Sequence, residues 1–294
     1  MLSWSMVAIA VLAGAAKGYC GKKTSSVAEH VHDAVYISAV RFGLCALLGG
    51  LIALMQSGLG AFAKVEGIWL TVIAGLAQAM FTTTWLLAVR TGAYVMLDAF
   101  LTAGILIPTL LCRFLFNEAI LPLQWLGFAI LLCAVLVMCS YNNSIKKKLN
   151  LKSIGLLLLC AVSSGIVDFT QKALNYQYPQ TPVAAFQFYT YVFAMLILAA
   201  VVLFVKPAGQ KPVSIKNFGW PLVIMAICLF INTYCKQLAA AKISAVALYS
   251  ACQGGGLILS VLMSAVCFRE PVKKRSIIGI ILIFAGMLLI TFVG

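Results

Sequence analysis

Long apolar runs separated by short polar joints make up almost the whole chain. A helix needs about 20 apolar residues to cross the hydrocarbon core of a bilayer, and the runs are close to that length. The pattern predicts an all-α polytopic membrane protein with ten transmembrane helices, and leaves no stretch for a soluble domain. The predicted spans are 2–20, 34–55, 68–89, 93–116, 120–140, 153–174, 182–205, 218–240, 243–268 and 276–293.

One short motif occurs twice at the end of an apolar run. Phe116-Asn117-Glu118 returns as Phe268-Arg269-Glu270, 152 residues later. The same offset holds without a gap through the flanking runs, where it pairs Leu86 with Leu238, Gly104 with Gly256 and Gly127 with Gly279. A register kept through two apolar runs, with a shared glutamate at the helix end, indicates an internal duplication.

The duplication predicts two five-helix repeats, residues 1–141 and 153–294, joined by a basic linker over 142–152. Because each repeat has an odd number of spans, the second must enter the membrane inverted relative to the first. Inverted repeats of this kind form a site near the bilayer midplane, which rocking of the two halves exposes to either side in turn.

Composition and charge support this interpretation. The chain is 63% hydrophobic and 10% charged, with a net charge of +14. Most basic residues fall in the short loops that follow the odd-numbered spans, so the charge is better explained by membrane topology and anionic lipid than by nucleic acid. The positive-inside rule then places both termini outside the cytoplasm. We expect a multi-pass protein of a cell membrane, such as the bacterial inner (plasma) membrane.

Three motifs resemble one family when taken together. They are Val40-Arg41-Phe42 at the start of the second span, Phe116-Asn117-Glu118, and Arg269-Glu270-Pro271, with Gly127 and Gly279 each nine residues after the glutamate. As a set they resemble the EamA-type ten-helix members of the drug/metabolite transporter superfamily. The resemblance implies a membrane transporter, and it implies a structural role for Arg41.

The chain also departs from the family pattern. The first repeat has Ala119 where the family often has proline, and the second repeat has Tyr189, Thr190 and Tyr191 near the position of the helix-two arginine. Many family members are thought to keep both termini in the cytoplasm, which the charge count of this chain contradicts.

Charged side chains inside the spans are the best pointers to function, since one at mid-bilayer costs roughly 2.5–3.5 kcal/mol on insertion scales. Asp98 lies in the fourth span, and its repeat mate is Ser250. It is either a site for a substrate amine or a proton, or a partner for a neighbouring lysine or arginine. Lys17 and Asp168 fall opposite each other across the pseudo-twofold axis, so they either pair directly or hold the two ends of a zwitterion.

The remaining candidate substrate-binding residues are polar and aromatic side chains of the third, fourth, sixth, eighth and ninth spans. They are Gln171, Lys172, Gln78, Trp85, Tyr94, Asn232, Lys236, Tyr249 and Gln253. Trp85 and Tyr94 have the alternative role of interface anchors. We expect spans 1, 3, 4, 6, 8 and 9 to line a central cavity, with spans 5 and 10 peripheral.

The mixture of acids, bases and amides favours a secondary transporter, active or facilitative, of a small polar or zwitterionic metabolite such as an amino acid. An exporter of organic cations or drugs is the alternative. An intramembrane enzyme is a remote one, because neither aspartate lies in a Tyr-Asp or Gly-x-Gly-Asp context and the chain has no G-x-S-x-G or H-E-x-x-H motif. We expect no cofactor, metal or nucleic acid. The expected partners are a small-molecule substrate and the lipid bilayer, and a coupled proton and the choice between monomer and homodimer stay open.

Overall fold

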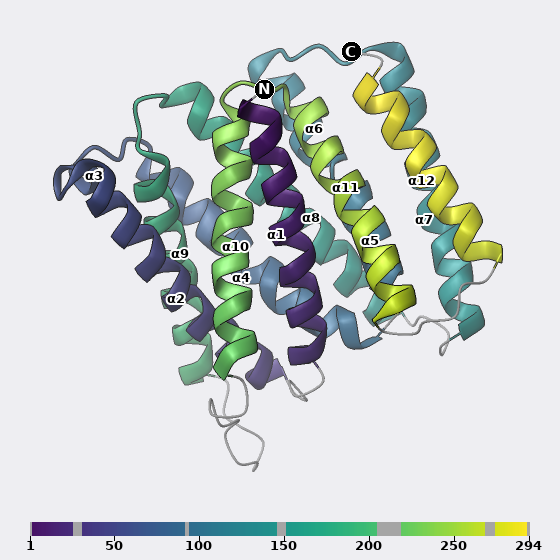
Figure 1. The fold of residues 1–294 in the computed structure, drawn as a ribbon, viewed down its shortest axis with the longest axis horizontal. Helices are drawn as coiled ribbons and strands as arrows, with labels where there is room; N and C mark the ends of the chain where they lie inside the picture. The colour runs from purple at the N-terminus through teal and green to yellow at the C-terminus, as the bar shows by residue number, and fades with distance from the viewer. Residues whose placement is uncertain are drawn as a thin grey trace.

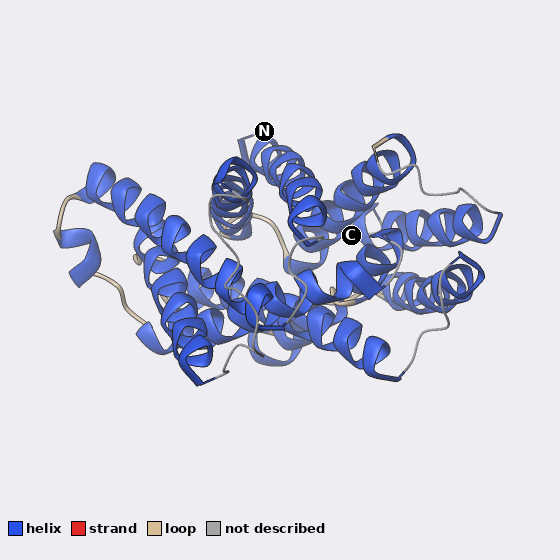
Figure 2. Cartoon of the chain, turned by 90° about the horizontal axis from the view of Figure 1, so that it is seen from below, coloured by secondary structure: helices blue, strands red, loops and turns tan. Residues whose placement is uncertain are grey.

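The computed structural model describes residues 2–25, 31–91, 94–145, 151–204, 219–267 and 274–292. Within these residues every regular element is a helix (Figure 2). The elements are α1 (Leu2–Ser25), α2 (Val31–Ser57), α3 (Gly60–Ala63), α4 (Ile68–Thr91), α5 (Tyr94–Ala103), α6 (Leu106–Phe116), α7 (Pro122–Ile145), α8 (Leu151–Gln177), α9 (Val183–Phe204), α10 (Gly219–Ala240), α11 (Ala245–Val266) and α12 (Lys274–Phe292).

Eight spans of the described chain are long and apolar enough to cross a membrane, and Pro122–Met138 and Ile277–Thr291 are shorter apolar helices. The prediction of an all-α polytopic membrane protein is therefore confirmed. The ten predicted spans correspond to α1, α2, α4, the α5–α6 pair and α7 to α12. The short helix α3, between α2 and α4, was not predicted.

The fourth span is broken, where the sequence pattern predicted one continuous helix over 93–116. The helix stops at Ala103 and restarts at Leu106. Pro108 lacks the N–H that would bond to the Gly104 carbonyl, so that carbonyl accepts instead from Ile107 N at 3.1 Å, an interaction one residue shorter than in an α-helix. The break therefore follows from the proline and lies in the helix that carries Asp98.

The helices are arranged so that each half packs mainly on the other. Figure 1 shows α2 beside α9 at one end of the bundle and α7 beside α12 at the other, with α1 and α10 side by side at the centre. Behind them α4 packs on α8 and α9. If the two predicted repeats are exchanged, the α1–α10 contact corresponds to the α8–α4 contact, and both are extensive. The first turn of α1 and the last turn of α12 lie at the same end, the upper one in Figure 1.

Two glycines allow α8 to approach the broken span closely. A Cβ added at Gly165 would lie 2.7 Å from Ile107 Cβ and 2.9 Å from the Gly104 carbonyl oxygen. A Cβ at Gly104 would lie 2.8 Å from the carbonyl oxygen of Ala161. Backbone therefore packs on backbone here, and this contact brings the polar positions of α8 next to α5.

The first copy of the repeated motif ends α6 at the upper side. Asn117 takes the left-handed conformation (φ 53°), which asparagine tolerates better than most residues, and its N–H donates to the Cys112 carbonyl. The Phe116 ring stacks on Tyr176 of α8, with 4.4 Å between ring centroids. The second copy, residues 268–270, lies outside the described part of the chain.

Glu118 links the two halves just beyond this turn. One carboxylate oxygen accepts a hydrogen bond from Ala245 N, the first residue of α11, at 3.0 Å, and the other lies 3.2 Å from Lys172 Nζ of α8. The Lys172 ammonium also donates to the carbonyls of Ala240 and Ile243, at 3.1 and 2.9 Å. A carboxylate at a helix N-terminus is favourable, because the unpaired N–H groups and the helix dipole are positive there. The upper ends of α6, α8, α10 and α11 are held together by this network.

Candidate functional site

A central cavity lies between the halves. Its described lining residues come from α1, α4, α5, α8, α10 and α11, which are the expected spans 1, 3, 4, 6, 8 and 9. The volume of the cavity that the centre of a water molecule can occupy is about 100 Å³. One water needs roughly 10–15 Å³ on that measure, so the cavity accommodates several waters or one small metabolite. Eight of the predicted residues line it: Lys17, Gln78, Trp85, Asp98, Asp168, Asn232, Lys236 and Gln253.

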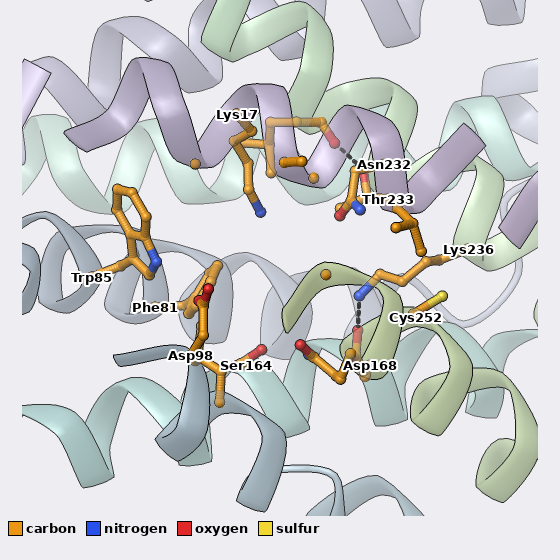
Figure 3. Close-up of a pocket in the computed structure, with 18 of the residues that line it drawn as sticks. Lys17, Phe81, Trp85, Asp98, Ser164, Asp168, Asn232, Thr233, Lys236 and Cys252 are labelled. Carbon is orange, nitrogen blue, oxygen red and sulfur yellow. Dashed lines mark hydrogen bonds and ion pairs between the residues drawn. The ribbon is translucent and has the colours of Figure 1, made fainter. Parts of the chain in front are cut away.

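Asp168 and Lys236 form a buried ion pair on one wall of the cavity (Figure 3). The two residues are 3% and 8% exposed. The Tyr249 hydroxyl donates to the backbone carbonyl of Asp168 at 2.5 Å, and its ring lies 6.0 Å from Lys236 Nζ. Of the two alternatives for Lys17 and Asp168, the direct pair is wrong, because the Asp168 carboxylate is paired with Lys236 of α10 instead.

Lys17 and Asp98 enter the cavity from opposite helices without pairing. In Figure 3 the Lys17 ammonium points inward from α1, and the Asp98 carboxylate points inward from α5. Lys17 Nζ lies 5.6 Å from the centroid of the Phe81 ring, a cation–π contact. Among the described residues neither Lys17 nor Asp98 belongs to an ion pair. The cavity therefore holds one neutralised charge pair and two separated charges of opposite sign.

Asn232 fixes the position of α1 against α10. Its amide nitrogen donates to the Ala10 carbonyl at 2.6 Å. Gly14 leaves room for this approach, because a Cβ there would lie 3.1 Å from that nitrogen. Thr233, next in the chain, is held by a 2.5 Å hydrogen bond with the Tyr191 hydroxyl. The α10 wall is thus set in place by contacts with both α1 and α9.

Four predicted site residues are not among those that line the cavity. Lys172 is engaged at the upper network with Glu118, and Tyr249 lies behind Asp168, as described above. Gln171 is 2% exposed and is not among the residues that line the cavity. The Tyr94 side chain lies outside the described residues.

The structure adds lining residues that the sequence interpretation did not include as candidates. Phe81 lies three residues after Gln78 and four before Trp85, and Ser164 lies four residues before Asp168. Helical spacing places residues three or four apart on one face, so this spacing could have identified both. Thr233 and Cys252 adjoin Asn232 and Gln253 in the sequence, and carried no comparable signal.

The chain is a polytopic membrane protein with an internal polar site. Its helices are long and apolar enough to span a membrane, and they enclose a polar cavity between the two halves. Residues 151–292 match the model of the EamA-like transporter family. The resemblance to EamA-type members of the drug/metabolite transporter superfamily is thereby confirmed. The match is to a family of transporters, which agrees with the expectation that the chain is not an enzyme.

The fold is also seen in solved structures. One of them, titled as the crystal structure of a protein, superposes with a TM-score of 0.73 over 99% of this chain and 96% of its own, at 15% sequence identity. At that identity the likeness concerns the fold alone. No curated protein sequence matches the chain.

Proposed function

We propose that the protein is a secondary transporter of a small zwitterionic metabolite, such as an amino acid, and that it works by alternating access. The observation that carries the proposal is the separation of Lys17 and Asp98 across one cavity. A ligand with an anionic and a cationic end would give each side chain an oppositely charged partner.

The chemistry of the lining supports a zwitterion over a singly charged ligand. The Lys17 ammonium would bind the substrate carboxylate, and the Asp98 carboxylate would bind the substrate ammonium, in charge-assisted hydrogen bonds. The Asp168–Lys236 pair is already neutral as a unit and would define one wall. Gln78 and Gln253 offer amides, and the rings at the Trp85 end of the cavity offer an apolar surface for the rest of the ligand.

An organic cation is the second candidate, since the Asp98 carboxylate and the aromatic rings suit one. The Lys17 ammonium argues against it, because it already occupies the face of the Phe81 ring, where an organic cation would otherwise bind. A cationic substrate would also leave Lys17 without a partner and add a like charge beside it.

Alternating access is supported by the arrangement of the halves, residues 1–141 and 153–294 with the linker 142–152. Their helices exchange partners as an inverted repeat requires. The Glu118–Lys172 network holds the upper ends of α6, α8, α10 and α11 together, and its opening would expose the site on that side. Lys22, Lys23, Lys152 and Lys274 occur at the lower ends of α1, α8 and α12, so we assign the lower side to the cytoplasm.

The first experiment identifies the ligand. The purified protein is screened by thermal shift against amino acids, amines, nucleosides and organic acids, because a ligand that binds the folded state raises its apparent stability. Stabilisation by zwitterions above their amine and carboxylate analogues is the expected result. A response to amines alone would favour the organic-cation alternative.

The second experiment tests the two residues. In proteoliposomes, Asp98→Asn and Lys17→Met should each reduce uptake of the identified zwitterion by roughly tenfold or more, the loss of one charge-assisted hydrogen bond. Lys242→Met, in the exposed turn between α10 and α11, is the matched control and should transport normally. Uptake at the wild-type rate by both cavity variants would remove Lys17 and Asp98 from the mechanism.

A further inference from the structure

Arg41 of α2 is a buried cation without a carboxylate partner among the described residues, and its Cζ lies 5.5 Å from the centroid of the Phe42 ring. It is 3% exposed, its Nε has no acceptor, and it takes part in no ion pair. Buried arginines in proteins are ordinarily paired with a carboxylate or bonded to carbonyls. A purely structural role, as expected from the sequence, would normally include such a partner.

Arg41 lines a small side pocket of the central cavity. The pocket is formed by Lys17, Arg41, Phe81, Thr82, Trp85 and Leu229, and four of these residues also line the central cavity. The volume of the pocket that the centre of a water molecule can occupy is about 10 Å³, roughly the minimum that one bound water needs. A monatomic anion or the tip of a carboxylate is of that size. Lys17 therefore lines both spaces, whereas Arg41 lines only the side pocket.

The side pocket is lined by hydrogen-bond donors, and Gln78, which lines the central cavity, adds another on the same helix as Thr82. The Thr82 hydroxyl is buried without a partner, and so is the amide nitrogen of Gln78, one helical turn earlier on α4. Arg41 and Lys17 have donors only. The described lining of the pocket contains no carboxylate. Donors without an acceptor that gather around one space are the groups that a bound anion would satisfy, since native proteins satisfy almost all such groups.

The balance of charges in the two cavities also indicates a bound anion. Their described lining carries three cations, Lys17, Arg41 and Lys236, against the two carboxylates of Asp98 and Asp168. A neutral zwitterion bound between Lys17 and Asp98 would leave this surplus of one positive charge unchanged. A ligand set with one additional negative charge would neutralise it.

We propose that the side pocket between Lys17 and Arg41 is an anion-binding subsite that completes the transport site. It takes either a second acidic group of the substrate, which would then be an acidic amino acid or a similar monoanion, or a free halide ion bound beside a neutral zwitterion. The inference deepens the proposed function, because Lys17 serves both the substrate carboxylate and the subsite.

The test compares two sources of anion on the purified protein. Unfolding temperature is followed in methanesulfonate buffer, whose anion is bulkier than the pocket, during titration with sodium chloride, L-glutamate or L-glutamine at constant ionic strength. Stabilisation by chloride identifies a free ion. A larger shift with glutamate than with its neutral isostere glutamine identifies an anion carried by the substrate. In Arg41→Gln the apparent affinity for either should fall roughly 10- to 100-fold.

A second variant keeps the test decisive if Arg41→Gln does not fold. Thr82→Val removes one donor from the pocket and should weaken the same anion roughly two- to tenfold. Thr190→Val is the matched control, because Thr190 of α9 is also buried with an unpartnered hydroxyl but lines neither cavity. Its titration should match that of the wild type.

The outcomes separate the subsite from the proposed function. The subsite is overturned if neither chloride nor glutamate has an effect beyond that of glutamine on the wild type, or if Arg41→Gln, or Thr82→Val in its place, keeps the wild-type response to both. Glutamine binding would survive such a result, and the zwitterion site with it. Conversely, an Arg41-dependent chloride response without binding of any zwitterion would retain the subsite and refute the proposed substrate class.

Discussion

Removal of one member of the Asp168–Lys236 pair should be far more harmful than removal of both. Asp168→Asn leaves the Lys236 ammonium, whose side chain is 10% exposed, without its counter-charge in a buried site. Breaking a buried pair in this way costs about 3–5 kcal/mol, whereas replacing both members by neutral groups of similar size is often close to neutral. We therefore expect Asp168→Asn to lose about 3–5 kcal/mol of unfolding free energy, and Asp168→Asn with Lys236→Met to recover most of it.

The assay is equilibrium unfolding in mixed micelles, with proteoliposome uptake measured on the same variants. Because the pair is assigned to the wall of the cavity, the double variant should also recover uptake in part. The matched comparison is Asp98→Asn with Lys17→Met, which removes the two separated charges. That double variant should fold well and still fail to transport, because its charges are assigned to the substrate.

Two results would refute this reasoning. An Asp168→Asn protein as stable as the wild type would show that Lys236 is satisfied without its carboxylate, by water or by the Tyr249 ring. A 168/236 double variant that folds but is as inactive as the 17/98 double variant would show that Asp168 or Lys236 binds the substrate itself, and the division of roles within the cavity would be wrong.

Three further predictions concern the frame around the cavity. Glu118→Gln should lower the unfolding free energy by roughly 1–3 kcal/mol, since Lys172 and the start of α11 lose a charged acceptor; wild-type stability in the same micelle assay would show that the Lys172–carbonyl bonds suffice. Gly165→Val should destabilise by about 1–3 kcal/mol or more by overpacking against the α5–α6 break, whereas Gly155→Val on the same helix meets nothing within 4 Å and should give normal yields of folded protein. Lys64 is assigned to the side opposite the cytoplasm. In a variant without other exposed cysteines, Lys64→Cys should therefore react with an impermeant maleimide in intact cells. Reaction only after permeabilisation would reverse the proposed orientation.

The positions of the membrane spans could be predicted from the sequence, because they follow from a local property. Whether a run is long and apolar enough to cross the bilayer depends on its own residues alone. The predicted span 68–89 became α4, Ile68–Thr91, and 218–240 became α10, Gly219–Ala240. The cavity-lining helices were also predictable, since a charged residue buried in lipid must face a partner or a polar space.

The pairing of those charges was decided only by the tertiary structure. Each residue turns a helix face by about 100°, and the rotation of a helix is set by packing against its neighbours. The sequence could not reveal that Asp168 faces Lys236 while Lys17 remains apart, or that Lys172 turns to Glu118 at the upper end. Arg41 is the sharpest case: the sequence marked it as a structural residue, and only its burial beside Lys17, with no acceptor near its Nε, revealed the side pocket. Charge–charge contacts between distant segments depend on distances of a few ångströms, and the periodicity of a single chain carries no record of these.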